Sequence, residues 1–246
     1  MKTSKDFFEV VKQNLFQVKE SQRENIFQAA KMLGDCMGEN GVVQLFGVDA
    51  GYAFSMELGY RAGGLMPFHI IKNDDLALRG YLSEAELYDR NINNREELAR
   101  NLYGLYRIEP NDLFLICDYG NLAITIEMAL LAKNFGHTVV AVVNKKLNES
   151  IDSNHSSGKK IMEIADLVID NCAEISDAIT EFDGEHKINQ VASINGNVIA
   201  QMLTAETYSY IKSLGKDCPI LLSANIKGAD VHNRKLSDKY LARWNS

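Results

Sequence analysis

The stretch that decides the fold is residues 113–143, which read LFLICDYGNLAITIEMALLAKNFGHTVVAVV. It opens with the apolar run 113–117, continues through a short turn into a helical pattern over 122–135, and ends in the β-branched run 138–143. Gly136 follows the helical pattern at the position where helices commonly end. A strand, a helix and a second strand form a βαβ unit, in which the two strands are parallel.

The same alternation continues on both sides of this unit. Further strand-like runs lie at 42–46, 67–71 and 167–169, a short late one lies at 220–222, and a long apolar helix is predicted over 191–214. Strands separated by helices favour a parallel sheet covered on both faces. The sequence therefore predicts an α/β fold, a three-layer α/β/α sandwich with a five-stranded parallel sheet.

An amphipathic helical pattern precedes the first strand. Residues 4–37 place apolar side chains three and four positions apart, which indicates one long helix or two consecutive ones. We expect residues 1–40 to form an N-terminal helical arm and residues 41–246 to form the α/β core of the same single domain, because no linker separates them. The arm has more apolar surface than one sheet face can cover, so a homodimer is predicted.

The composition excludes several classes of protein. A net charge of −7 without a basic run argues against binding to nucleic acid or anionic membranes. No stretch has the length of a membrane span or the pattern of a signal peptide, so a cytoplasmic location is expected. The four cysteines are far apart and the histidines are not clustered. No disulfide framework, metal site or cofactor is therefore predicted.

Three ordered motifs carry a family resemblance. They are ELGYRAGGL at 57–65, HSSGKK at 155–160 followed by ADLVIDN at 165–171, and SAN at 223–225 followed by DVHN at 230–233. In this order, over nearly the whole chain, the sequence resembles bacterial sugar isomerase (SIS) domain proteins of uncharacterised activity, and more distantly phosphoheptose isomerase and N-acetylmuramic acid 6-phosphate etherase. The resemblance implies a sugar derivative as ligand more firmly than it implies a reaction.

The resemblance also implies two ligand-binding loops, at 47–51 and 117–121. In SIS proteins such loops surround a phosphate with backbone N–H groups and Ser or Thr hydroxyls. Here both loops keep glycines but contain no Ser or Thr, and each contains an aspartate. Two unit negative charges about 4 Å apart repel each other by about 4 kcal/mol at an effective dielectric of about 20, so weak binding of sugar phosphates is predicted. The residues expected to contact a ligand there are Gly47, Asp49, Gly51, Asp118, Gly120 and Asn121.

Other interpretations of the two aspartates remain open. The carboxylates suit a neutral or amine-bearing sugar, a metal between them, or a site that has lost its ligand. Asp49 and Asp118 also stand where helices begin, and an aspartate is a good N-cap.

Three residues are the candidates for acid–base chemistry. The resemblance assigns to Glu57 the role of the base that moves a proton between sugar C1 and C2, although an ion pair with Arg61 would explain it equally well. His155 and His232 lie in the motifs and could transfer protons near neutral pH. A hydrogen bond that orders its loop is the alternative for His155. A cap of the last helix or an interface contact is the alternative for His232.

Three further side chains complete the predicted site. Ser156 follows His155, Ser193 begins the long late helix, and Asn225 lies in the SAN motif. We expect Glu57, His155 and the loops at the carboxyl ends of the strands to converge on one crevice, with His232 reaching the same crevice or that of a second copy of the chain. The sequence thus favours a sugar-derivative-binding SIS protein, either an aldose–ketose isomerase with weakened phosphate loops or a non-catalytic sugar sensor or scaffold.

Overall fold

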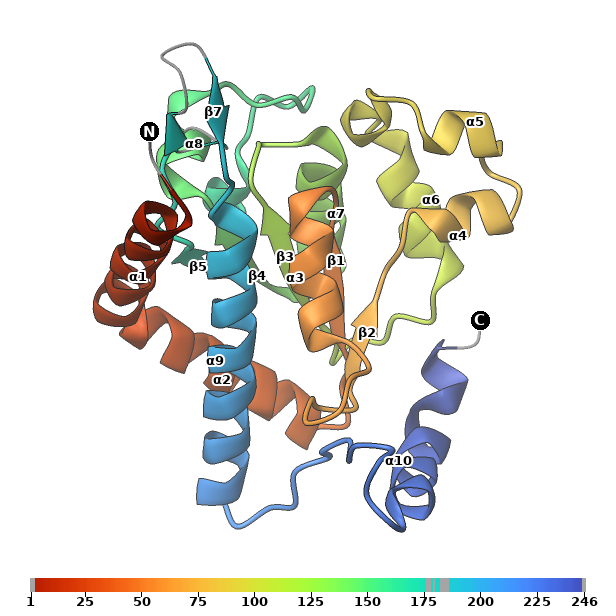
Figure 1. The fold of residues 1–246 in the computed structure, drawn as a ribbon. Helices are drawn as coiled ribbons and strands as arrows, with labels where there is room; N and C mark the ends of the chain where they lie inside the picture. Colours follow the sequence, from red (N-terminus) through yellow and green to blue (C-terminus); the bar gives the residue numbers. More distant parts are fainter. Residues whose placement is uncertain (1–2, 176–177, 179, 182–185, 245–246) are drawn as a thin grey trace.

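The fold is an α/β sandwich built on one parallel sheet (Figure 1). The computed structural model describes residues 3–175, 178, 180–181 and 186–244. The strands of the sheet are β1 (Val43–Gly47), β2 (Phe68–Ile70), β3 (Leu113–Asp118), β4 (Thr138–Val143) and β5 (Leu167–Asp170). Their order is β2-β1-β3-β4-β5, and every neighbouring pair is parallel. The predicted five-stranded parallel sheet is confirmed.

One face of the sheet packs against helices from both ends of the chain. These helices are α2 (Arg23–Gly38), α3 (Ala50–Leu58) and α9 (Ala192–Ser213). Leu45 of β1 and Leu115 of β3 are fully buried among their apolar side chains. Successive side chains along a strand point to opposite faces of the sheet, and Leu45 and Leu115 both point to this face and share its core.

The other face is covered by the middle of the chain. Its helices are α4 (Asp74–Leu78), α5 (Glu84–Leu87), η1 (Ile92–Asn94), α6 (Glu97–Leu105), α7 (Ala123–Asn134) and η2 (Ile161–Glu163). Phe46, Phe114 and Ile116, which alternate with the residues of the first core, pack here. The complete burial of β1 and β3 explains why both read as continuous apolar runs.

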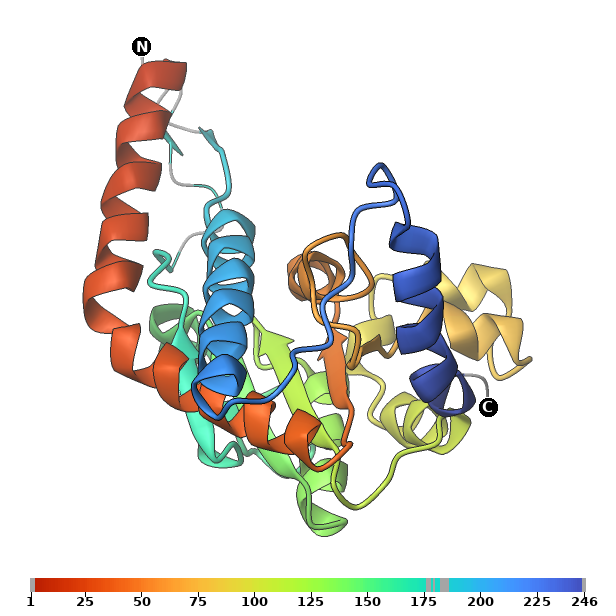
Figure 2. The same cartoon turned by 90° about the horizontal axis from the view of Figure 1, so that it is seen from below.

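The N-terminal arm consists of two helices. The chain bends at Gln22, between α1 (Ser4–Ser21) and α2. Helix α1 extends from the body and lies beside α9 (Figure 2). It leaves Phe8 and Phe16 each 62% exposed. None of the described helices is long and apolar enough to cross a membrane.

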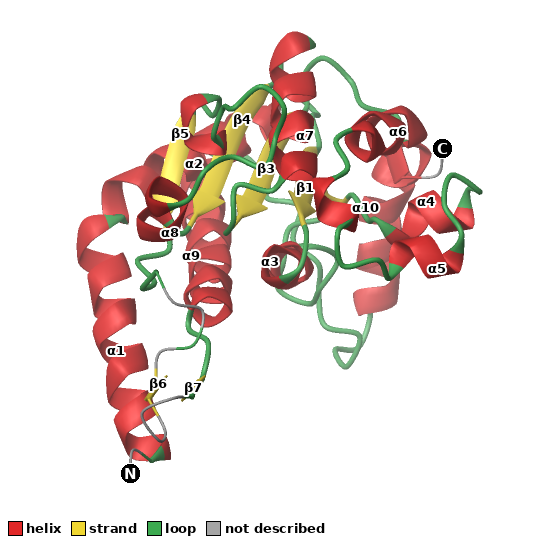
Figure 3. Cartoon of the chain, turned by 90° about the horizontal axis from the view of Figure 1, so that it is seen from above, coloured by secondary structure: helices red, strands yellow, loops and turns green. Residues whose placement is uncertain are grey.

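The segments that follow β4 differ in part from the prediction. Residues 144–158, expected to be a loop, contain the short helix α8 (Lys145–Ser150). Further along the chain, the small strands β6 (Thr180–Glu181) and β7 (Lys187–Ile188) pair with each other. The expected strand at 220–222 is wrong, because this segment does not join the sheet. Ile220 makes one isolated antiparallel bridge with Leu65, and Leu221 exchanges backbone bonds with Gly63 and Gly64. Helix α10 (Ala229–Trp244) then lies beyond β1, on the side of the sheet away from β5 (Figure 3).

Candidate functional site

A pocket of about 230 Å³ lies beyond the carboxyl ends of β1 and β2. Its walls come from the loop after β1, from the first turn after β2, and from α5 and η1. The loops after β1 and β2 leave the parallel sheet at the same edge, the carboxyl ends of the strands, where ligands of open α/β sheets bind. We call it the strand-end pocket; the residues used below are Gly47, Asp49, Tyr52, Lys72, Asn73, Asp74, Tyr88 and Asn93.

Side-chain amides hold Asp49 in the wall of this pocket. Its Oδ2 accepts a hydrogen bond of 2.9 Å from Nδ2 of the buried Asn93. Asn93 Oδ1 in turn accepts a bond of 3.3 Å from Asn73. Asn73 Oδ1 is buried and has no hydrogen bond from the described residues. A buried acceptor without a partner costs about 1–3 kcal/mol, so a ligand donor at this position would be stabilised.

The strand-end pocket has a negative electrostatic character. Asp49 and Asp74 line it against a single cation, Lys72. Burial raises the pKa of Tyr52, and the charges of Asp74 and Asp75 raise it further. The field at the tyrosine therefore opposes another negative charge. This pocket suits donors such as sugar hydroxyls or an ammonium group better than it suits a phosphate.

The loop after β3 is closed upon itself. Asp118 is buried, and its Oδ1 accepts backbone N–H bonds from Gly120 at 2.9 Å and Leu122 at 3.4 Å. Burial raises the pKa of Asp118 to about 6, although these backbone hydrogen bonds act in the opposite direction. The aspartate thus orders the turn before α7 and does not line the strand-end pocket. The N-cap residue of α7 is Leu122, and Asp49, the N-cap residue of α3, makes no side-chain cap bond, so neither carboxylate acts as an N-cap acceptor.

Asn121 fixes the same loop to the segment after β4. Its Nδ2 donates to the carbonyl oxygens of Asn148, at 2.8 Å, and Ile151, at 3.2 Å. Its Oδ1 accepts a bond of 2.9 Å from the Asn148 side chain. Asn121 has a φ of 50° and is fully buried. The side chain predicted to contact a ligand therefore makes its bonds within the protein, and Gly120 provides a backbone N–H to Asp118.

A tyrosine ring fills the space between this loop and α9. Tyr119 packs against the first core, and its hydroxyl is buried beside Cys117 and Asn171. A Cβ at Gly196 of α9 would lie 2.1 Å from that hydroxyl oxygen, so only glycine allows the close approach. Ser193, one turn earlier on α9, is half-buried. The crevice between the loop and α9 is thus occupied by a side chain.

His155 is buried in a hydrogen-bond cluster on the α7 side of the sheet. Ser157 donates its backbone N–H to Nδ1 at 3.0 Å, which leaves the ring proton on Nε2. Nε2 lies 2.9 Å from Oε2 of Glu127 and 3.3 Å from Oε2 of Glu96. Ser156 donates its backbone N–H and its hydroxyl to Glu96, at 2.6 and 2.9 Å. This pattern matches the loop-ordering alternative for His155.

The same cluster contains the ligand types of a metal site. One ligand atom from each of Glu96, Glu127 and His155 lies within 4.8 Å of the others. However, Glu127 Oε1 already accepts a bond of 2.7 Å from Arg100 Nε. A metal on Nε2 would also move the ring proton to Nδ1, against the N–H of Ser157. The bonds present therefore favour a closed hydrogen-bond network over a metal centre.

Glu57 lies on the opposite face of the sheet from His155. It is on α3, where its Oε1 accepts a bond of 2.7 Å from Gln201 of α9 and its Oε2 pairs with Arg61. It lines a shallow apolar groove of about 570 Å³ on α9, beside Ile194, Val198 and Met202. We call this the α9 groove. The expected convergence of Glu57 and His155 is wrong within one chain, because α3 and α7 cover different faces.

The C-terminal motifs lie away from the strand-end pocket. His232, on α10, donates from Nε2 to the Ile220 carbonyl at 2.9 Å and faces a second cavity. Asn225 is exposed, and its backbone N–H contacts the Ser223 hydroxyl at 3.3 Å. Neither residue lines the strand-end pocket.

Of the predicted ligand-binding residues, the structure brings only Gly47 and Asp49 into the wall of the strand-end pocket. Gly51 supports that wall from behind, packed on the Cys117 carbonyl. Sequence reasoning missed Tyr52, Asn73 and Asn93. Asn73 comes shortly after a strand, which was an available signal. Asn93 lies in a long polar segment and offered none.

Comparisons with known proteins agree with this architecture. The SIS domain profile matches residues 6–144. A UPF0309 protein from Caldanaerobacter subterraneus is 31% identical over 242 residues, covering 96% of this chain and 97% of its own length. One from Geobacillus sp. WCH70 is 32% identical over 239 residues, covering 96% and 95%.

Solved structures show the same fold at low identity. Phosphoheptose isomerase from Neisseria gonorrhoeae superposes with a TM-score of 0.55 at 14% identity, covering 82% of this chain and 95% of the isomerase. The enzyme from Francisella tularensis gives a TM-score of 0.53 at 14% identity, with coverages of 84% and 98%. The domain profile, the relatives and the fold agree, and this chain belongs to the SIS domain family.

Proposed function

We propose that this protein binds a neutral or amine-bearing sugar derivative in the strand-end pocket. The observation that carries the proposal is the pair of acceptors in its wall: the buried, unpaired Asn73 Oδ1 and the Asp49 carboxylate held by Asn93. Sugar hydroxyls or an ammonium group would donate to both, and the rings of Tyr52 and Tyr88 would contact the sugar carbons. Membership of the SIS family supports a sugar derivative as the ligand.

Binding without catalysis is the form of this function that the geometry favours. Glu57 and His155 lie on opposite faces of the sheet, and His155 makes its hydrogen bonds to Glu127 and Ser157. Tyr119 occupies the space beside α9 where a second part of a ligand would have to enter. One chain therefore does not assemble an acid–base pair around the pocket, and a sugar-sensing role follows.

A calorimetric titration tests the proposal. Glucosamine, fructose and N-acetylglucosamine should be titrated into the wild type, Asn73→Leu and Asp49→Asn. We expect at least one sugar to bind the wild type and Asn73→Leu to weaken it by about tenfold, since a lost hydrogen bond of this kind is worth about 1–1.5 kcal/mol. If glucosamine is the ligand, Asp49→Asn should weaken it more than it weakens fructose.

The matched control is Asn91→Leu, because Asn91 is exposed near η1 and does not line the pocket. It should bind like the wild type. Equal affinity of wild type and Asn73→Leu for every sugar that binds would contradict the assignment of this pocket.

A second candidate function is aldose–ketose isomerisation with Glu57 as the base. One observation favours it: Glu57 opens onto the α9 groove, where a second copy of the chain could supply the acid, such as His232. Incubation of glucose or fructose in D₂O should then place deuterium at C2 of the aldose, and Glu57→Gln should abolish the exchange. Exchange that persists in Glu57→Gln would remove Glu57 from the mechanism.

The proposed assembly is a homodimer through the N-terminal arm. Phe8 and Phe16 of α1 are each 62% exposed and Phe27 of α2 is 41% exposed. Specific interfaces bury about 800 Å² on each partner, and such a row of aromatic side chains would supply much of it. Sedimentation should show a dimer at tens of micromolar and a shift toward monomer in Phe8→Glu/Phe16→Glu. A monomeric wild type would contradict this assembly.

A further inference from the structure

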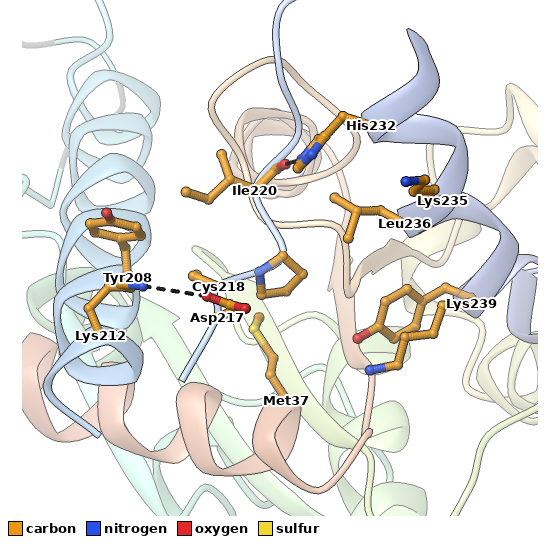
Figure 4. Close-up of a pocket in the computed structure, with 12 residues that line it drawn as sticks. Met37, Tyr208, Lys212, Asp217, Cys218, Ile220, His232, Lys235, Leu236 and Lys239 are labelled. Carbon is orange, nitrogen blue, oxygen red and sulfur yellow. Dashed lines mark hydrogen bonds and ion pairs between the residues drawn. The ribbon is translucent and has the colours of Figure 1, made fainter. Parts of the chain in front are cut away.

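A second cavity lies near the opposite end of the sheet from the strand-end pocket. It has a volume of about 530 Å³, is open to solvent on one side, and is bordered by the ends of α2 and α9, the segment after α9, and α10 (Figure 4). Tyr240 of α10 borders it and packs on Val42, just before β1, and on Met66. We call it the α10 cavity. No motif recognised in the sequence refers to it except His232.

The inner face of α10 carries positive charge. His232, Lys235, Leu236, Lys239 and Tyr240 all line the cavity, and their spacings of three and four place them on one side of the helix. The face of a helix that meets the body of a protein is usually apolar. Here it presents two lysines four residues apart, and like charges at that spacing repel each other. Both lysines are exposed to water, which weakens this repulsion, and an anion between them would replace the repulsion with attraction.

Protein carboxylates do not neutralise these lysines. Among the described residues, neither Lys235 nor Lys239 makes an ion pair, and Lys239 contacts only the face of the Tyr240 ring, 5.2 Å from its centre. Lys212 of α9 faces them across the cavity and lies 3.7 Å from the exposed Asp217. Three lysines thus line the cavity against one aspartate, in a chain whose net charge is −7.

The remaining wall is apolar and fixed. Tyr208, Leu236 and Ile220 line it, and the bond of His232 to the Ile220 carbonyl ties α10 to the opposite wall (Figure 4). Lysine ammonium groups bind phosphate or carboxylate oxygens as point charges, and apolar side chains cover the carbon skeleton of a ligand.

We propose that the α10 cavity is a binding site for a small anionic metabolite. Its phosphate or carboxylate group lies between Lys212, Lys235 and Lys239, and its organic part lies against Tyr208 and Leu236. This site is separate from the strand-end pocket and opposite to it in charge. It does not depend on the function proposed for that pocket.

Cys218 offers a direct test because it lines the cavity. The other three cysteines, all in the described part of the chain, are buried. Alkylation of Cys218 by the uncharged reagent N-ethylmaleimide can be followed by mass spectrometry with inorganic phosphate, glucose 6-phosphate, glucuronate or glucose present. An anion at ten times its Kd should slow alkylation by about tenfold. Glucose should have no effect, and the phosphate and glucuronate arms identify which anion binds.

Charge variants locate the anion. Lys235→Gln/Lys239→Gln should lose the protection, and Lys235→Arg/Lys239→Arg should retain it. The matched control Lys145→Gln/Lys159→Gln removes the same charge at exposed positions outside the cavity and should remain protected. Thermal unfolding shows whether each variant is folded before labelling.

Three results would overturn the proposal. The first is equal protection of Cys218 in Lys235→Gln/Lys239→Gln and in the wild type, and the second is that glucose protects as well as the anions do. The third is that no anion protects at 10 mM, a concentration of roughly ten times a millimolar Kd. Asp49→Asn should leave the protection unchanged. The proposal of sugar binding in the strand-end pocket and the proposal of anion binding in the α10 cavity are therefore tested independently.

Discussion

The loops after β1 and β3 are alike in sequence and opposite in environment. Each contains glycine and one aspartate and lacks Ser and Thr. Asp49 is exposed and lines the strand-end pocket, whereas Asp118 is buried and accepts backbone bonds within its own loop. The role of an aspartate at a strand end is therefore set by what packs over it. An open loop leaves a carboxylate for a ligand, and a covered loop uses it as the acceptor for its own backbone N–H groups.

Replacing a glycine by alanine should give the largest difference in stability between the two loops. A Cβ on Gly51 would lie 2.6 Å from the carbonyl oxygen of Cys117, a backbone atom that cannot move aside. A Cβ on Gly120 would meet only Leu122, at 3.6 Å. We expect Gly51→Ala to lower the free energy of unfolding by about 3 kcal/mol and Gly120→Ala to change it by less than about 1 kcal/mol. Urea denaturation of both variants measures the difference, and equal losses would contradict the close approach.

Glycine substitutions at the residues with positive φ should show the second-largest difference in stability between the two loops. Asp49 has a φ of 51° and Asn121 a φ of 50°, where glycine is less strained. Asn121→Gly also removes the bonds to Asn148 and Ile151, so it should cost about 2 kcal/mol. Asp49→Gly loses one bond, to Asn93, and should lie within about 1 kcal/mol of the wild type. Thermal unfolding would refute the contrast if both glycine variants were equally stable.

The buried Asp118 should make stability depend on pH. Its pKa is about 3.8 when exposed and about 6 in the fold, so the native state holds more protons than the unfolded state between these values. The free energy of unfolding therefore falls as pH rises from about 4 to 6. Asp118→Asn keeps the acceptor without the charge and should be more stable than the wild type by about 1–2 kcal/mol at pH 7.5.

The advantage of Asp118→Asn should shrink to little at pH 4.5, where the wild-type carboxyl is largely protonated. Asp118→Ala is the matched control, because it removes the acceptor of the Gly120 and Leu122 N–H groups. It should be less stable than Asp118→Asn at every pH. A difference between wild type and Asp118→Asn that did not change with pH would show that the charge is not responsible.

The smallest expected effect concerns phosphorylated ligands. Only Asp49 lines the strand-end pocket, so Asp49→Ser alone should raise the affinity of that pocket for fructose 6-phosphate, by about tenfold, and high salt should reduce the gain. Asp118→Ser should not raise it. Calorimetry in a Lys235→Gln/Lys239→Gln background keeps the α10 cavity out of the measurement. Equal gains in the two serine variants would mean that the two loops are not different after all.

Much of the fold was predictable from the sequence. Residues 113–143 form the expected βαβ unit, and the arm over residues 4–37 is helical with one bend. Continuous apolar runs and helical periodicity are local properties, so they survive whatever packs around them. The run 220–222 is also apolar, yet it forms only one isolated bridge, between Ile220 and Leu65, with further backbone bonds to residues 63–64 outside the sheet. Leu221 packs with Tyr240 of α10, a contact that no local pattern indicates.

The site depended on contacts between distant segments. The motifs placed Glu57 and His155 beside ligand-end loops, but only the packing of α3 and α7 put them on opposite faces of the sheet. Nothing local distinguishes Asp49 from Asp118, or marks Asn93 as the partner of Asp49 across 44 residues.

The sequence by itself therefore determined the parallel sheet, the N-terminal arm and the kinship to SIS domains, because these rest on periodicity and ordered motifs. Only the tertiary structure decided which aspartate is open, that His155 is held by Glu127, and that the lysines of α10 face a cavity. Burial and charge at a side chain are set by segments far away in the chain, and those segments meet only when the chain folds.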